Sequence, residues 1–147
     1  MGHRRSAPGH RLNAPVYKSA STSLRVRYNE CDPLGVVFNA NYLVYADLAI
    51  NELWREHLGG YEAMMEEGLD LAVVEANLRY FAPLRFDDEF VAEVKVEHIG
   101  TKSMTTAFSL TRGDEEVAAG TLAYVCVDSA SNESRPVPDS IREGLTA

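Results

Sequence analysis

Asp32 is the acidic residue that is hardest to explain as ordinary protein surface. It lies in a turn-rich stretch that begins at Asn29, and the mostly apolar residues 34–38 follow it. A carboxylate beside such residues would be partly desolvated, which favours work as a nucleophile or a base. The alternative role is that of a turn-forming aspartate whose side chain binds its own backbone.

A long helix is predicted just after this loop. Residues 40–57 contain no Gly or Pro, and their apolar residues recur at spacings of three and four. Asn39 or Asn41 could cap the helix, and the Gly-Gly pair at 59–60 could end it. Free N–H groups at such a start would stabilise an oxyanion. Because one loop separates them from Asp32, both could converge on a single carbonyl, which is the minimum for acyl transfer by hydrolysis.

The remaining elements would have to position this loop. Apolar residues occur around much of the helix circumference, which predicts a buried helix that a sheet could wrap. Period-two alternation predicts strands over 24–28, 71–81, 89–98, 103–112 and 116–128. Short connections favour antiparallel hairpins, so the expected order is a strand, the long helix and a four-stranded meander. The predicted fold class is α+β.

Length and composition limit both the organisation and the function. The 147 residues suit one domain, and we expect a disordered basic tail over 1–21, the domain over 22–138 and a C-terminal tail over 139–147. The last segment holds a short candidate helix near 139–145 with little to pack against. The tail also fits the myristoylation pattern at Gly2 and the composition of a transit peptide. These alternatives stay open.

Charge and cysteine content exclude several classes of function. The net charge is −8, and residues 1–21 contain basic but no acidic residues, so the acidic body should not bind nucleic acid or membrane. The two cysteines form no CxxC, and the four histidines show no metal-binding spacing, so we expect no metal and no cofactor. Without an apolar signal or span, the expected location is cytoplasmic.

The run VRYNECDPLGVVFNANY, residues 26–42, closely resembles the opening motif of the hot-dog-fold acyl-CoA thioesterases of the 4-hydroxybenzoyl-CoA thioesterase-like family. The long helix, the segment RYFAPLRFDDE at 79–89 and the closing strands extend the resemblance over about residues 22–138. The resemblance implies an antiparallel five-stranded sheet wrapped around one long helix. It also implies hydrolysis of an acyl-CoA or acyl-carrier thioester by a homodimer or homotetramer.

The same resemblance assigns roles to single residues. Asp32 falls on the catalytic aspartate, described as nucleophile or general base, and Asn39 falls where a backbone N–H polarises the thioester carbonyl. Many family members carry His or Tyr at the second position, so any role of an imidazole is lost here while a main-chain donor survives. The expected substrate contacts are Gly35, Val36, Val37, Lys102 and Ser103. Lys102 suits phosphate as a mobile point charge.

Three neighbouring or reserve candidates complete the set. Glu30 is more typical of a solvated loop acid, and Cys31 of a small buried side chain. Asp47 lies on the long helix, where a related branch of the superfamily places its acid, and is held in reserve.

Three functions remain: an acyl-CoA thioesterase, a thioesterase acting on carrier-bound chains, and a non-catalytic module that binds acyl thioesters. A single sheet and helix leave sheet edges open, so we expect a dimer at least, with a site shared between chains.

Overall fold

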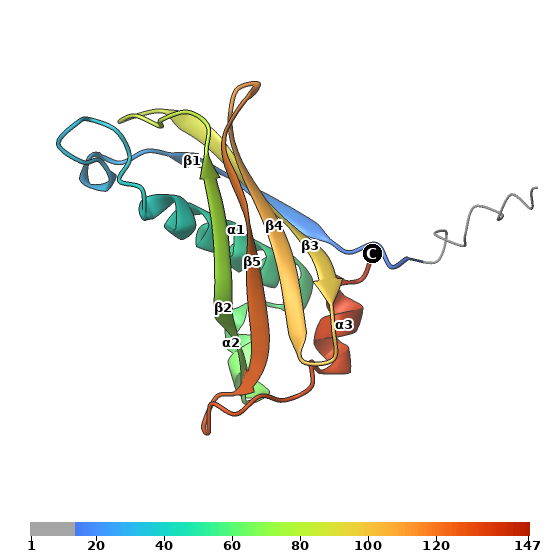
Figure 1. The fold of residues 1–147 in the computed structure, drawn as a ribbon. Coiled ribbons are helices and arrows are strands. Elements are labelled where there is room, and N and C mark those ends of the chain that lie inside the picture. The colour runs from blue at the N-terminus through green and yellow to red at the C-terminus, as the bar shows by residue number, and fades with distance from the viewer. Residues whose placement is uncertain (1–13) are drawn as a thin grey trace, which may run out of the picture.

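The computed structural model describes residues 14–147 as one sheet with helices on its concave face and at its ends (Figure 1). The strands are β1 (Ser19–Arg25), β2 (Leu69–Tyr80), β3 (Glu89–Ile99), β4 (Ser103–Arg112) and β5 (Glu115–Asp128). The helices are the 3-10 turn η2 (Tyr28–Glu30), α1 (Asn41–Leu58), α2 (Tyr61–Glu66) and α3 (Asp139–Leu145). Most of the predicted basic tail lies outside the described residues, and so does Gly2, the site of the myristoylation pattern.

The five strands form one antiparallel sheet in the order β1-β3-β4-β5-β2. The predicted α+β class and five-stranded sheet are confirmed, but the four-stranded meander is wrong. Of the four strands after the helix, β3, β4 and β5 are neighbours in chain order, whereas the connection 81–88 carries the chain from β2 at one edge of the sheet past β5 and β4 to β3, which lies next to β1. At the edge of the sheet, β2 pairs with β5, and its outer edge pairs with no other strand within residues 14–147.

Helix α1 packs along the concave face of the sheet, against β1 and β3 (Figure 1). The predicted helix is confirmed, and it ends as predicted at Gly59, whose φ of 77° lies in the left-handed region that glycine adopts without strain. The helix contributes seven side chains to the core: Tyr42, Tyr45, Ala46, Ala49, Ile50, Leu53 and Trp54. The sheet wraps around this helix as predicted, and the side of the helix that faces away from the sheet leaves Val44 and Leu48 exposed.

The predicted caps at the start of α1 are also wrong. The capping residue is Ala40, and its side chain makes no hydrogen bond. The Asn41 amide instead reaches back and donates to the Glu30 carbonyl at 2.9 Å. The Asn41 side chain thus ties the start of the helix to the preceding loop and does not cap the helix.

Three other elements differ from prediction. The first strand was expected at 24–28 but begins at Ser19, because its outward positions are serines and its inward ones are small, which weakens the period-two signal. The expected boundary at residue 22 therefore falls inside β1. The short helix expected at 139–145 is confirmed as α3, but it does have packing partners, since Ile141 and Leu145 are buried in the core. Helix α2 was not predicted.

Candidate active site

The loop that carries Asp32 is held in one shape by backbone pairing. Its two arms run antiparallel, with Cys31 bridged to Val37 and the Phe38 N–H donating to the Glu30 carbonyl at 2.9 Å. A second set of bonds joins the loop to the β2–β3 connection, where the Val37 N–H donates to the Leu84 carbonyl at 2.8 Å. The loop therefore has a fixed position relative to the start of α1.

Asp32 lies at the turn of this loop and is half-buried. Its Oδ1 accepts the Leu34 N–H at 2.8 Å, and its own N–H donates to the Val36 carbonyl at the same distance. This is the turn-forming arrangement that the sequence offered as the alternative to catalysis. One carboxylate oxygen holds the turn and the other makes no protein hydrogen bond within residues 14–147. The two roles are therefore compatible, since a carboxylate has several acceptor positions.

The start of α1 presents two unused backbone donors. The Phe38 carbonyl accepts the Asn41 N–H at 2.9 Å, and the Asn39 carbonyl accepts both the Tyr42 N–H at 3.4 Å and the Tyr80 hydroxyl at 2.8 Å. Within the described part of the chain, the N–H groups of Asn39 and Ala40 have no acceptor. Because the first N–H groups of a helix carry partial positive charge, this pair could bind an oxygen that becomes an oxyanion.

A shallow groove of about 320 Å³ lies beside these donors. It is lined by Val36, Val37, Asn39, Tyr42, Tyr80, Phe81, Ala82 and Pro83. Three of the expected site residues, Asn39, Val36 and Val37, thus share one groove, although the Val37 side chain is 3% exposed and also belongs to the core. Gly35 lies outside the groove at the exposed tip of the loop, where its φ of 77° serves the turn.

Comparisons with known proteins agree on the family. A family model described as "Thioesterase-like superfamily" matches residues 26–145. The chain belongs to this superfamily. It is 29% identical over 119 residues to a protein of Escherichia coli named acyl-CoA thioester hydrolase YbgC, covering 80% of this chain and 89% of that protein.

Solved structures of other proteins share this hot-dog fold. A hypothetical protein from Aquifex aeolicus superposes with a TM-score of 0.81 at 26% identity, over 85% of this chain and 98% of that one. A 1,4-dihydroxy-2-naphthoyl-CoA thioesterase from Synechocystis superposes with a TM-score of 0.78 at 15% identity, over 86% of this chain and 95% of that one. The five-stranded antiparallel sheet and its long helix are thus the fold of this family.

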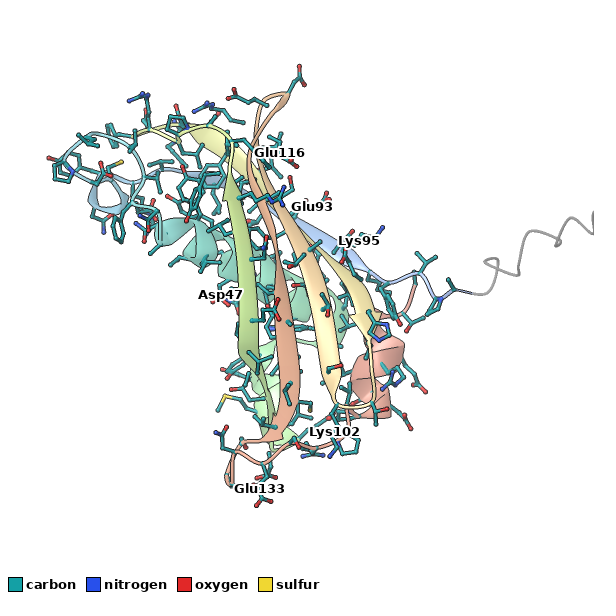
Figure 2. The ribbon with its side chains drawn as sticks, viewed as in Figure 1. Asp47, Glu93, Lys95, Lys102, Glu116 and Glu133 are labelled. Carbon is teal, nitrogen blue, oxygen red and sulfur yellow. The ribbon has the colours of Figure 1, made fainter. Side chains whose placement is uncertain are left out.

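In this superfamily member, Lys102 and Ser103 are not brought to the loop within one chain. Both lie at the β3–β4 turn, whereas the loop contacts the segment that leads into the start of β3. The 11 residues of β3 separate the two places by roughly 35 Å. Figure 2 shows Lys102 at the end of the sheet that lies away from the loop.

The reserve residue Asp47 lines a separate hollow of about 340 Å³ between α1, α2 and β2. Asp70 shares this hollow and accepts the Tyr61 hydroxyl at 3.1 Å. Burial raises the pKa of the Asp47 carboxyl. Tyr124 also lines this hollow, and burial raises its pKa to about 12. The structure therefore places Asp47 outside the groove that Asn39 lines.

Glu30 and Cys31 have structural contacts. The Glu30 carboxylate accepts the Arg27 N–H at 2.6 Å, which closes the η2 turn. The Cys31 thiol, which is half-buried, donates to the Arg27 carbonyl at 3.8 Å. Both side chains help to shape the loop on which Asp32 lies.

Tyr42 and Tyr80 also line the groove, and the sequence did not reveal them as candidate site residues. Tyr80 reaches the start of α1 from the end of β2, and its ring meets the Tyr42 ring edge-on with centroids 5.0 Å apart. The Tyr42 hydroxyl accepts the Leu84 N–H at 3.0 Å. The one available signal was the pair of aromatic residues at 80–81, where a strand ends and a loop begins.

Two further findings concern the described residues as a whole. No helix within 14–147 is long and apolar enough to cross a membrane. In the same part of the chain, no group of three or more His, Cys, Asp or Glu side chains is arranged to hold a metal ion.

Proposed function

We propose that this chain hydrolyses acyl-CoA thioesters, with Asp32 as nucleophile or general base and the N–H groups of Asn39 and Ala40 as oxyanion donors. The observation that carries the proposal is that one hydrogen-bonded loop carries a half-buried carboxylate and leads directly into helix N–H groups that have no acceptor within residues 14–147. Membership of the thioesterase-like superfamily and similarity to the Escherichia coli acyl-CoA thioester hydrolase support the reaction class.

The proposed reaction needs a carboxylate that acts as a base or a nucleophile, and N–H donors that stabilise the oxyanion. In the general-base route, the Asp32 carboxylate takes a proton from water as the water oxygen bonds to the thioester carbon. The carbonyl electron pair moves to oxygen, where the N–H groups of Asn39 and Ala40 stabilise the negative charge. When the carbonyl reforms, the C–S bond breaks, and the leaving thiolate takes up the proton that Asp32 had accepted, which restores the carboxylate. In the nucleophilic route, an Asp32 carboxylate oxygen bonds to the thioester carbon, the C–S bond breaks, and the thiolate leaves and takes up a proton from water. Water then cleaves the resulting acyl anhydride to the free acid and the Asp32 carboxylate.

The Asn at position 39 fits this chemistry, because the donors are main-chain groups. The Asn39 side chain makes no hydrogen bond within residues 14–147, whereas its carbonyl accepts two. A side chain at this position can therefore change without loss of the N–H donor. For this reason we favour an enzyme over a non-catalytic module that only binds acyl thioesters.

We further propose that the enzyme works as a dimer that pairs through β2. In the described part of the chain, the outer edge of this strand has no partner, and its Val73 and Val74 are 54% and 61% exposed. Unpaired backbone groups beside apolar side chains are a template for a second strand. The opposite edge strand, β1, presents mainly serines outward and is less suited to association.

A second copy would also account for the distant substrate residues. Lys102 is exposed and lies at the far end of the sheet from the loop of its own chain (Figure 2). If Lys102 and Ser103 contact the phosphates of CoA, they do so at the loop of the partner copy. The proposed compartment is the cytoplasm, where thiols such as Cys31 and Cys126, both free here, stay reduced.

The test is release of free thiol from matched thioesters. Purified protein is offered aromatic, short aliphatic and long aliphatic acyl-CoAs, and the best acyl group is then offered on a carrier protein. Faster turnover of the CoA form is expected, since the acidic chain and the acidic carrier would repel each other. Preference for the carrier form would support the carrier thioesterase instead. Tight acyl-CoA binding without thiol release would favour the non-catalytic module.

A further inference from the structure

Tyr80 makes a contact with the start of α1 that no local rule of helix structure requires. Its hydroxyl donates to the Asn39 carbonyl at 2.8 Å across 41 residues of chain. The Tyr80 side chain is half-exposed, but its ring rests edge-on against Tyr42, which is 3% exposed. A rigid core residue thus fixes the direction in which the Tyr80 hydroxyl points.

We infer that Tyr80 is a positioning residue that orients and strengthens the oxyanion donor at Ala40, and this inference rests on the proposed function. The Asn39 carbonyl and the Ala40 N–H belong to one planar trans peptide group and point in opposite directions. Holding the carbonyl oxygen therefore fixes the direction of the N–H. Donation to the carbonyl also polarises the amide, which makes its N–H a stronger donor.

The neighbouring peptide group provides the comparison that singles out Tyr80. The Phe38 carbonyl, which shares a peptide with the Asn39 N–H, is held by the Asn41 N–H of the backbone at 2.9 Å. That bond does not depend on any side chain. Within residues 14–147, the Tyr80 hydroxyl is the only side-chain group that holds either of the two peptides. The direction of the Asn39 N–H is therefore fixed by the backbone, whereas the direction of the Ala40 N–H depends on the Tyr80 side chain.

The Tyr80 hydroxyl is suited to remain a donor. Partial burial, with a contribution from nearby Tyr42, raises the pKa of the Tyr80 phenol. The proton therefore stays in place across the neutral range, and the hydrogen bond should not titrate there.

The test substitutes Tyr80→Phe, which keeps the ring contact with Tyr42 and removes only the hydroxyl. We expect kcat to fall about 3- to 15-fold while KM changes less than about twofold, because the lost hydrogen bond acts on the transition state and not on substrate binding. In ¹³C NMR spectra, the Asn39 carbonyl resonance should move upfield, since its oxygen loses a donor. A hydroxyl that touched substrate directly would instead raise KM.

The matched control is Tyr61→Phe. This substitution also removes a tyrosine hydroxyl that donates to an oxygen acceptor, the Asp70 carboxylate at 3.1 Å, but at the far end of α1. Both variants should melt within a few degrees of the wild type, and Tyr61→Phe should keep its kcat. A shift of the Asn39 resonance without a change in kcat for Tyr80→Phe would overturn the inference and leave the proposed function standing. An unmoved resonance would overturn it as well, and absence of thiol release by the wild type would overturn both.

Discussion

Removing the Tyr42 hydroxyl should weaken the attachment of the Asp32 loop to the rest of the domain. Tyr42 is 3% exposed, and its hydroxyl accepts the buried Leu84 N–H at 3.0 Å. In Tyr42→Phe the ring still fills its space, but the Leu84 N–H loses its acceptor and has no access to water. A buried donor without a partner costs about 1–3 kcal/mol. For a domain of this size, that corresponds to a melting temperature about 3–10 °C lower.

The assay is differential scanning calorimetry, combined with hydrogen exchange at the Leu84 amide. Tyr28→Phe is the control, since Tyr28 is 82% exposed and its hydroxyl has no protein partner within residues 14–147. The control should be stable to within about 0.5 kcal/mol of the wild type. A Tyr42→Phe protein with unchanged melting and unchanged Leu84 protection would refute the reasoning that this hydroxyl fastens the loop.

Three further predictions concern packing, charge and assembly. Gly120→Ala should lower the free energy of unfolding by more than about 2 kcal/mol in urea titrations, because a Cβ there would lie 1.9 Å from the Asn77 carbonyl oxygen. Burial raises the pKa of Asp88, but the Arg85 N–H and the Arg112 guanidinium lower it by more, so the net shift is downward. The ionised Asp88 carboxylate therefore stabilises the fold above the ordinary carboxyl pKa, and this stabilisation is lost as the pH falls below about 4. Asp88→Asn should therefore be less stable at pH 7, and thermal melts should show the difference shrinking in acid; a constant difference would contradict this. Val74→Lys should shift sedimentation from dimer to monomer, and an unchanged dimer would exclude the β2 edge.

The long helix and most strands could be predicted because their signals are local. The absence of Gly and Pro over 40–57, followed by Gly59, defines α1 almost to the residue. The strands β3, β4 and β5 alternate apolar and polar residues at period two, and their burial alternates in the same way. Such patterns record which face of an element meets the core, and this is the information that a single sequence carries best.

Strand order could not be predicted, because the length of a connection does not determine where it leads. The connection 81–88 is short enough for a hairpin, yet it does not join neighbouring strands. It passes the start of α1 and leads from β2 to β3, which are separated in the sheet by β5 and β4. Bonds that no local pattern records fix this path. The Arg112 guanidinium donates to the Pro83 carbonyl at 3.0 Å and to the Asp88 carboxylate at 2.6 Å.

The candidate site was likewise predicted only in part. Asp32 and the helix start were found from their chemistry and from resemblance to a family. Tyr42 and Tyr80 were missed, because each acts on backbone about 40 residues away and looks in sequence like ordinary aromatic core. Lys102 was predicted to contact substrate at the site, although within a single chain Lys102 and the Asp32 loop lie at opposite ends of β3.

The most direct test of the account is the turnover of Asp32→Asn. The asparagine Oδ1 can still accept the Leu34 N–H, so the loop should keep its shape while the carboxylate is lost. Asp87→Asn is the matched control, because Asp87 is an exposed acid whose φ of 68° also suits asparagine. With acyl-CoA substrates and detection of free thiol, kcat for Asp32→Asn should fall at least about 100-fold, and the control should retain wild-type kcat. An Asp32→Asn protein that turns over like the wild type would contradict the central claim.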